Sequence, residues 1–228
     1  IPYSLEEIEQ ATLATVDSQG YEDAYVRPVA WRGSEMMGVS AQQSTIHLAI
    51  AVWEWPSYFS PEARMQGIKL KWAPYKRPSP ECAPVHSKAA GLYMICTLSK
   101  HAAEADGFDD ALMLDWRGQI AETTGANVFL VIDGVIHTPT PDCFLNGITR
   151  RSVIDLARSH GIEIVERAIM PEELSNAAEI FVTGTAAEVT PVSQIDNMKF
   201  GVGPITKMLL ADYDQLVREP LRADTSVS

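Results

Sequence analysis

A β-hairpin in the second half of the chain restricts the possible folds more than any other sequence feature. The apolar run 127–132 is followed by Asp133–Gly134, a pair that favours a two-residue hairpin turn, and then by the run 135–138. Other strand-like runs lie at 24–31, 45–52, 109–115, 120–122, 162–166 and 179–184. Helix-like segments lie at 4–16, 93–106, 152–160, 171–177 and 206–217. The chain is therefore predicted to be a mixed α/β (α+β) protein, in which the doubly apolar run 45–52 is a central strand.

Proline marks the expected division of the chain into domains. The segment 53–72 contains Pro56, Pro61 and Gly67 and is interpreted as a connection, and 74–84 is a proline-rich extended loop. These features predict two domains, 1–62 and 63–228. Ser4 and Glu7 form a helix capping box at the very start of the sequence. The chain is therefore expected to begin partway through the smaller domain.

Charge and cysteine content narrow the classes of partner. The chain has 18 basic and 30 acidic residues and a net charge of −12, which repels nucleic acids and anionic membrane surfaces. No apolar run is long enough to span a membrane. Three cysteines without metal-like spacing predict free thiols in a reducing cytoplasm. The scattered histidines predict no metal site.

A lysine near the middle of the chain is the first candidate for chemistry. Lys88 is followed by small residues and, five positions on, by Tyr93. The apolar run 92–96 predicts that this segment is buried, and burial lowers the pKa of a lysine. A neutral amine could form a Schiff base with an aldehyde cofactor. The alternative is a lysine whose stem packs while its ammonium group reaches water.

Four further features supply groups that complement such a lysine. Glu122 ends a predicted strand, where a carboxylate could keep a heteroaromatic nitrogen protonated. The segment 145–150 leads into a predicted helix, whose free N–H groups suit a phosphate, and 183–188 offers hydroxyls and backbone donors. Tyr25 and Arg27 point the same way in a strand and could face an acidic substrate. Each feature has an ordinary alternative: an exposed glutamate, a capped helix, a strand exit or a solvated strand face. Together they match pyridoxal phosphate, which needs a lysine, an acid and dense N–H donors.

Four motifs follow one another along the chain: Lys88-x-x-Gly91-x-Tyr93, Glu122-x-x-Gly125-x-Asn127-x-Phe129, Leu145-x-Gly147-Ile148-Thr149-Arg150 and Gly184-Thr185-Ala186-Ala187-Glu188. In this order they resemble the class IV (fold type IV) pyridoxal-phosphate enzymes. The first motif, with Tyr25-x-Arg27-Pro28, is most similar to the branched-chain amino acid aminotransferases. The resemblance runs from residue 1 to about 217. It implies a small N-terminal α/β domain, incomplete here, and a larger domain with a mixed β-sheet or pseudo-barrel.

The resemblance also implies roles for individual residues. Lys88 resembles the Schiff-base lysine and acid/base, Glu122 the partner of the pyridine nitrogen, and Tyr93 the tyrosine near the phenolic oxygen. The remaining cofactor contacts would come from a ring-packing residue and the phosphate turns: Leu145, Gly147, Ile148, Thr149 and Thr185. Thr185 and Ala186 would offer N–H groups to the substrate carboxylate. The substrate pocket would be shaped by Tyr25, Arg27, Tyr58 and Val39, with Val39 reaching a neighbouring subunit.

The activity implied by the resemblance is ping-pong transamination of leucine, isoleucine or valine with 2-oxoglutarate, in a cytoplasmic homodimer or higher homo-oligomer. The site would lie in the cleft between the two domains. Two departures from the family pattern stand out: Leu92 replaces an asparagine of many relatives, and the sequence as given is expected to start after the family's N-terminal segment. The alternatives are a D-amino acid or amine transaminase of the same fold and a non-catalytic protein that retains it.

Overall fold

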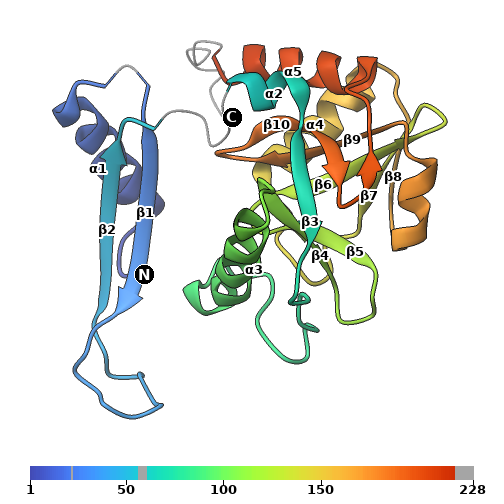
Figure 1. Cartoon of the computed structure of the whole chain (residues 1–228). Coiled ribbons are helices and arrows are strands. Elements are labelled where there is room, and N and C mark those ends of the chain that lie inside the picture. Colours follow the sequence, from blue (N-terminus) through green and yellow to red (C-terminus); the bar gives the residue numbers. More distant parts are fainter. Residues whose placement is uncertain (22, 56–60, 219–228) are drawn as a thin grey trace. The chain divides into compact units, whose positions relative to one another are not determined.

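The computed structural model describes residues 1–21, 23–55 and 61–218. The chain forms two compact units, Ile1–Tyr58 and Phe59–Ser228, and the smaller one is drawn in blue to teal shades in Figure 1. The predicted boundary after residue 62 falls inside helix α2 (Pro61–Gln66), which belongs to the larger unit. Among the described residues, no helix is both long and apolar enough to cross a membrane.

The smaller unit consists of one helix and one hairpin. Helix α1 (Leu5–Gln19) begins at the predicted capping box, with Ser4 and Glu7 bonded to each other's backbone, and ends at Gly20 in the left-handed conformation. Strands β1 (Tyr25–Arg32) and β2 (Ile46–Trp53) pair antiparallel. The prediction that 45–52 is a central strand is wrong within the described residues. Strand β2 pairs there with β1 alone, and its exposure alternates along the strand because only one face is covered.

The larger unit is built on a closed six-stranded barrel. Its strands are, in hydrogen-bonded order, β3 (Ile68–Trp72), β4 (Asp110–Leu114), β5 (Ile120–Thr123), β6 (Asn127–Ile132), β9 (Glu179–Gly184) and β10 (Glu188–Ile195). Strand β10 returns to pair with β3 and so closes the barrel, and β3 is parallel to both of its neighbours. The sheet continues from β6 through β7 (Val135–Pro139) to β8 (Ile164–Arg167), and from β10 to β11 (Met198–Lys199). This confirms the mixed α/β class and the predicted pseudo-barrel.

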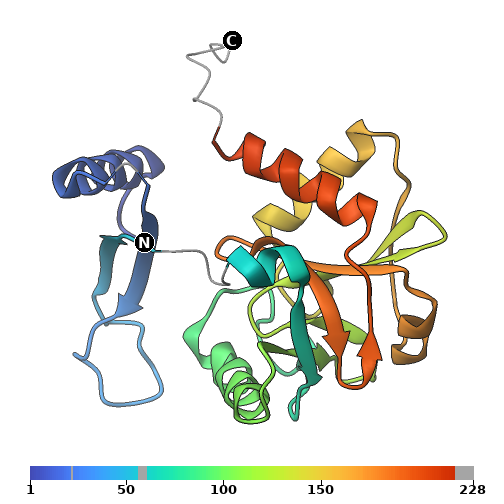
Figure 2. The ribbon, with the colours of Figure 1, turned by 45° about the horizontal axis from the view of Figure 1, so that its top comes forward.

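Helices lie around this sheet. Helices α4 (Ile148–Ser159) and α5 (Pro204–Leu216) pack against each other beside β9, and α3 (Tyr93–Ala105) packs on β3 and β4. Figure 2 shows α4 and α5 together on one side of the barrel and α3 at another. Two short 3₁₀ helices, η1 (Ala90–Leu92) and η2 (Pro171–Asn176), complete the unit.

Two buried layers follow from the period-2 alternation of β6. Val128 and Leu130 contribute to the cluster that fills the barrel, whereas Phe129 and Val131 contribute to the cluster under α4 and α5. The Phe129 ring stacks on Phe181 of β9 with centroids 4.8 Å apart. Both faces of the strand are therefore covered, which is why residues 128–131 are buried without a polar interruption.

Several element predictions are confirmed and others are wrong. The Asp133–Gly134 turn has positive φ at both residues, 52° and 79°, as the hairpin required. The segment interpreted as a connection contains β3, where Ile68 and Leu70 are fully buried. The strand was missed because lysines alternate with these apolar residues. Strands β10 and β11 were not predicted, and α4 begins at Ile148, not at residue 152.

Candidate active site

Lys88 lies in the loop that precedes η1 and α3. Its Nζ donates a hydrogen bond to the Tyr93 hydroxyl at 2.9 Å, so the lysine and tyrosine of the first motif meet across a single turn. The predicted burial of Lys88 is wrong, because its side chain is exposed. The buried face of α3 is formed by Cys96, Ser99 and Ala103, and the small residues after Lys88 do not cover its ammonium group.

Glu122 lies on β5 with only 13% of its side chain exposed. Its carboxylate is 3.4 Å from the Arg77 Nε, and Asn127 Nδ2 donates to its other oxygen at 3.4 Å. Burial raises the pKa of Glu122 to about 8, against the opposing effects of the Arg77 and Lys88 charges. Lys88 is therefore near enough to act on Glu122 electrostatically.

A second acid, Asp110, acts electrostatically on Glu122. Asp110 opens β4, is buried, and accepts hydrogen bonds from the Thr124 hydroxyl and the Ala111 N–H. Burial raises the pKa of Asp110, and the charge of Lys100 opposes this rise. The charge of Asp110 in turn raises the pKa of Glu122, so ionisation of one carboxyl disfavours ionisation of the other.

Arg77 is the residue that the sequence analysis missed. It leaves the proline-rich loop, is 4% exposed, and approaches the Cys143 carbonyl and Cys96 Sγ at 3.5 Å in addition to Glu122. A buried guanidinium beside a single carboxylate stabilises its ionised form. An arginine among prolines gave no pattern signal, since only the tertiary fold carries it to β5.

The segment 145–150 forms a helix N-terminus that can receive an anion. Gly147 is the N-cap of α4 and supplies no side-chain cap, so the N–H groups of Ile148 and Thr149 point outward from the first turn. The Thr149 hydroxyl lies 3.1 Å from that of Tyr213 on α5. Arg150, 1% exposed, is bonded to Glu166 at 2.8 Å and to the Pro139 carbonyl at 3.1 Å, which anchors the helix start to β7 and β8.

The turn 185–187 joins β9 to β10 beside the second motif. A side chain at Gly184 would meet the Gly125 carbonyl oxygen at 3.2 Å, so this turn and the turn after Glu122 are in contact. Thr185 is exposed at the tip and Ala186 is half-buried. Glu188 has a φ of 51° and is bonded to Arg64 of α2 at 2.6 Å. The ion pair holds a strained residue at the base of the turn.

The substrate residues predicted in the smaller unit have a local arrangement of their own. Arg27 Nη2 lies 3.4 Å from the Tyr25 hydroxyl, and its guanidinium is 5.5 Å from the ring centroid of Trp53. Trp53, which the sequence analysis assigned to a connection, thus joins the Tyr25–Arg27 face. Val39 is fully exposed. Tyr58 lies outside the described residues.

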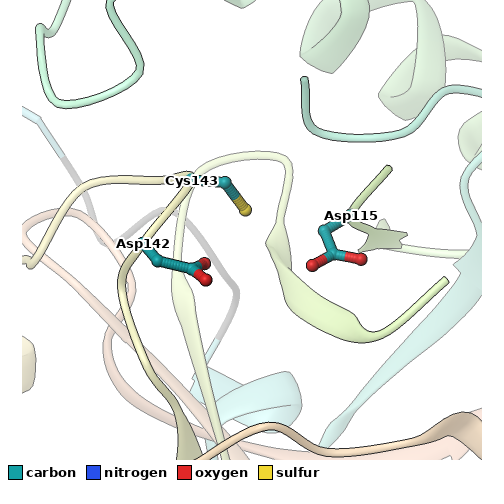
Figure 3. Close-up of side chains that lie close together, drawn as sticks. All are labelled: Asp115, Asp142 and Cys143. Carbon is teal, nitrogen blue, oxygen red and sulfur yellow. The ribbon is translucent and has the colours of Figure 1, made fainter. Parts of the chain in front are cut away.

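Within the part of the chain that the structure describes, the group that most resembles a metal site is Asp115, Asp142 and Cys143, whose ligand atoms lie within 4.8 Å of one another (Figure 3). The Arg117 guanidinium, however, bonds to both carboxylates at 2.7 Å. Burial raises the pKa of the Cys143 thiol to about 12, so the sulfur is protonated at neutral pH. The cluster is therefore described as an ion-pair network around Arg117.

Comparisons with known proteins agree with this geometry. The family model described as amino-transferase class IV matches residues 1–195. A branched-chain-amino-acid aminotransferase of Pseudomonas aeruginosa is 42% identical over 220 residues, which cover 95% of this chain and 72% of the relative.

Two solved structures are also similar. The branched-chain aminotransferase of Thermoproteus uzoniensis with norvaline has a TM-score of 0.90 at 35% identity, covering 95% of this chain and 72% of its own. The T.th. branched-chain amino acid aminotransferase with pyridoxamine 5'-phosphate has a TM-score of 0.92 at 39% identity, covering 96% and 74%. With the barrel, the four motifs in order and these matches, the chain belongs to the class IV aminotransferase family.

Proposed function

We propose that the chain binds pyridoxal 5'-phosphate and catalyses ping-pong transamination of leucine, isoleucine or valine with 2-oxoglutarate. The observation that carries the proposal is that the Glu122 carboxyl is joined through the Asn127 amide to the loop before the start of α4, with the Lys88 charge near enough to act on Glu122. Similarity to branched-chain aminotransferases over 95% of the chain supports the substrate class.

The residues present fit this cofactor. The Glu122 carboxyl has long contacts of 3.4 Å to its partners and a pKa near neutrality, so it can share a proton with a basic ring nitrogen. The N–H groups of Ile148 and Thr149, with Thr185 of the neighbouring turn, would hold the phosphate, and Leu145 would pack on the ring. When bound, pyridoxal phosphate supplies an aldehyde that condenses with amines and a ring that delocalises the electron pair left by a departing proton.

The protein's own part in the reaction centres on the Lys88 amine. As an ammonium group it donates to the Tyr93 hydroxyl, and it must lose a proton before its nitrogen can act as a nucleophile or base. Tyr93 fixes the position of Nζ through their 2.9 Å bond. The same amine then removes a proton from the substrate's α-carbon and returns one later, so a single residue serves as base and acid.

Two kinds of group would recognise the substrate: backbone N–H donors, and charged or aromatic side chains. The backbone N–H groups of Thr185 and Ala186 suit the carboxylate next to the reacting carbon. Arg27 offers a positive charge to the distal carboxylate of 2-oxoglutarate, and the rings of Tyr25 and Trp53 offer an apolar wall to aliphatic side chains. Val39, in the same unit as Arg27, is proposed as a further substrate residue. An amine and a carbonyl oxygen exchange places between two acids, so no oxidant or reductant is consumed.

The decisive experiment tests Lys88 chemically. The chain is incubated with pyridoxal 5'-phosphate, reduced with borohydride and digested, and the modified residue is located by mass spectrometry. We expect the label on Lys88, its loss in Lys88→Ala, and its retention in the control Lys76→Ala, which removes an exposed lysine of the neighbouring loop. Transamination by Lys88→Ala at the wild-type rate would refute the proposal.

Half-reactions with different amine donors test the substrate class. The absorbance of the bound cofactor is followed after addition of L-leucine, D-alanine or a chiral amine. We expect L-leucine to react fastest. A faster reaction with D-alanine or the amine would identify another transaminase of the same fold, and no reaction with any donor would favour a non-catalytic protein.

The proposal extends to assembly and location. We infer a homodimer or higher homo-oligomer, because Met37 and Val39 are fully exposed apolar side chains in the smaller unit. We infer a cytoplasmic location because Cys82, Cys96 and Cys143 are all free thiols. Sedimentation velocity and cell fractionation test the two inferences, and a monomer at working concentration would contradict the first.

A further inference from the structure

The side chain of Asn127 joins the second sequence motif to the third. It opens β6, is 5% exposed, and its residue pairs with Glu122 on β5 and with Thr183 on β9. Its Nδ2 donates to the Leu145 carbonyl at 3.0 Å and to Glu122 Oε2 at 3.4 Å. One neutral amide therefore connects the acid to the loop that leads into α4.

The same amide also determines why residue 147 is a glycine. A Cβ at Gly147 would lie 2.5 Å from Asn127 Oδ1, although the φ of −58° at this position would suit any residue. The space beside the helix start is thus filled by Asn127 and not by a side chain of its own. Asn127 touches both the Glu122 carboxyl and the residue that caps α4.

Two partners of Glu122 have separable tasks. Arg77 carries a charge and so affects whether Glu122 is ionised, whereas the amide of Asn127 is neutral and constrains mainly where the carboxyl lies. The same Nδ2 also donates to the Leu145 carbonyl, and the amide oxygen lies beside Gly147. A shift of the α4 N-terminus would therefore move Asn127, and Glu122 would lose its orientation.

We propose that Asn127 is a positioning residue that fixes the separation between the Glu122 carboxyl and the N–H groups at the start of α4. A ligand with a basic ring nitrogen at one end and a phosphate at the other then meets both partners at once. This inference rests on the proposed binding of pyridoxal 5'-phosphate. Its consequence is a coupling: the phosphate contributes fully to affinity only while the nitrogen end is held, and the reverse.

The experiment compares two ligands that differ only in the phosphate. Dissociation constants of the cofactor-free chain are measured for pyridoxal 5'-phosphate and for pyridoxal, and their ratio reports the contribution of the phosphate. In Asn127→Ala we expect both affinities to fall and the ratio to shrink about 10-fold. The pH midpoint of the bound cofactor's absorbance should also shift, which a purely structural asparagine would not cause.

A second variant, Gly147→Ala, tests the same role while leaving the amide of Asn127 in the chain. In Gly147→Ala the added Cβ displaces Asn127, so we expect a similar loss in the ratio. In the double variant Asn127→Ala/Gly147→Ala, the ratio should be no smaller than in Asn127→Ala alone, because the added Cβ then occupies the space that the asparagine left. Asn197→Ala, in an exposed turn, is the matched control and should leave the ratio unchanged.

The outcomes separate this inference from the proposed function. If the wild-type chain binds neither ligand, the proposed cofactor is wrong. If it binds both and the ratio is unchanged in folded Asn127→Ala and Gly147→Ala, judged by circular dichroism, the proposed role of Asn127 is refuted while the function stands. If Asn127→Ala fails to fold, the ratio measured in Gly147→Ala decides.

Discussion

Replacing Arg77 with glutamine should raise the pKa of Glu122 further. An opposite charge at this range lowers a carboxyl pKa by about 1 to 3 units, and one unit corresponds to about 1.4 kcal/mol. Arg77 Nε is 3.4 Å from the carboxylate, and both side chains are largely buried, so solvent screens the pair little. We therefore expect the pKa of Glu122 in Arg77→Gln to lie above the wild-type value of about 8.

The sign of the effect on stability follows from the two states of the chain. In the unfolded chain, Glu122 ionises above its ordinary pKa of 4.5, whereas in the folded chain it keeps its proton up to about pH 8. Between these values the folded state binds more protons, so the free energy of unfolding falls by about 1.4 kcal/mol per pH unit from this group. Above pH 8 the decline ends in the wild type, but in Arg77→Gln it should continue.

Urea unfolding of the cofactor-free chain at pH 6, 7, 8 and 9 measures this decline. Each protein is compared with its Glu122→Gln counterpart, so that the contributions of all other titrating groups cancel. Arg77→Lys keeps the charge and should resemble the wild type more closely than Arg77→Gln, and Lys76→Gln removes an exposed neighbouring charge as a control. Carbon-13 NMR of labelled glutamate gives the pKa directly. A pKa in Arg77→Gln equal to or below that of the wild type would refute the reasoning.

Two further predictions concern the start of α4. Gly147→Ala should lower the free energy of unfolding by about 1 to 3 kcal/mol, because the new Cβ would lie 2.5 Å from Asn127 Oδ1 in a packed wall; urea unfolding at pH 7 measures it, and an unchanged value would contradict the crowding. Arg150→Met should lower the free energy of unfolding by about 3 kcal/mol. The substitution removes a buried guanidinium, so Glu166 loses its ion pair and the Pro139 carbonyl loses its donor. A loss below about 1 kcal/mol in the same assay would show that Glu166 and the carbonyl are satisfied by water.

Elements whose formation depends on nearby residues could be predicted from the sequence. The Ser4–Glu7 capping box, the Asp133–Gly134 turn and the apolar run of β6 each depend on neighbours within a few residues, so their signals lie in the chain itself. The order of the four motifs likewise identified the family, and the lysine, the acid and the phosphate-suited turns were named from residue type.

The burial of those residues and the charges around them are set by the tertiary structure. Ile68 and Leu70 alternate with lysines and resemble a connection, yet barrel closure between β4 and β10 buries them completely. Lys88 was expected to be buried and is exposed, whereas Glu122, for which an exposed glutamate was the alternative, is nearly enclosed. Arg77 reaches Glu122 from a loop far away along the chain. Burial and charge proximity depend on which strands are neighbours, and that is fixed by the closure of the whole barrel, not by any window of sequence.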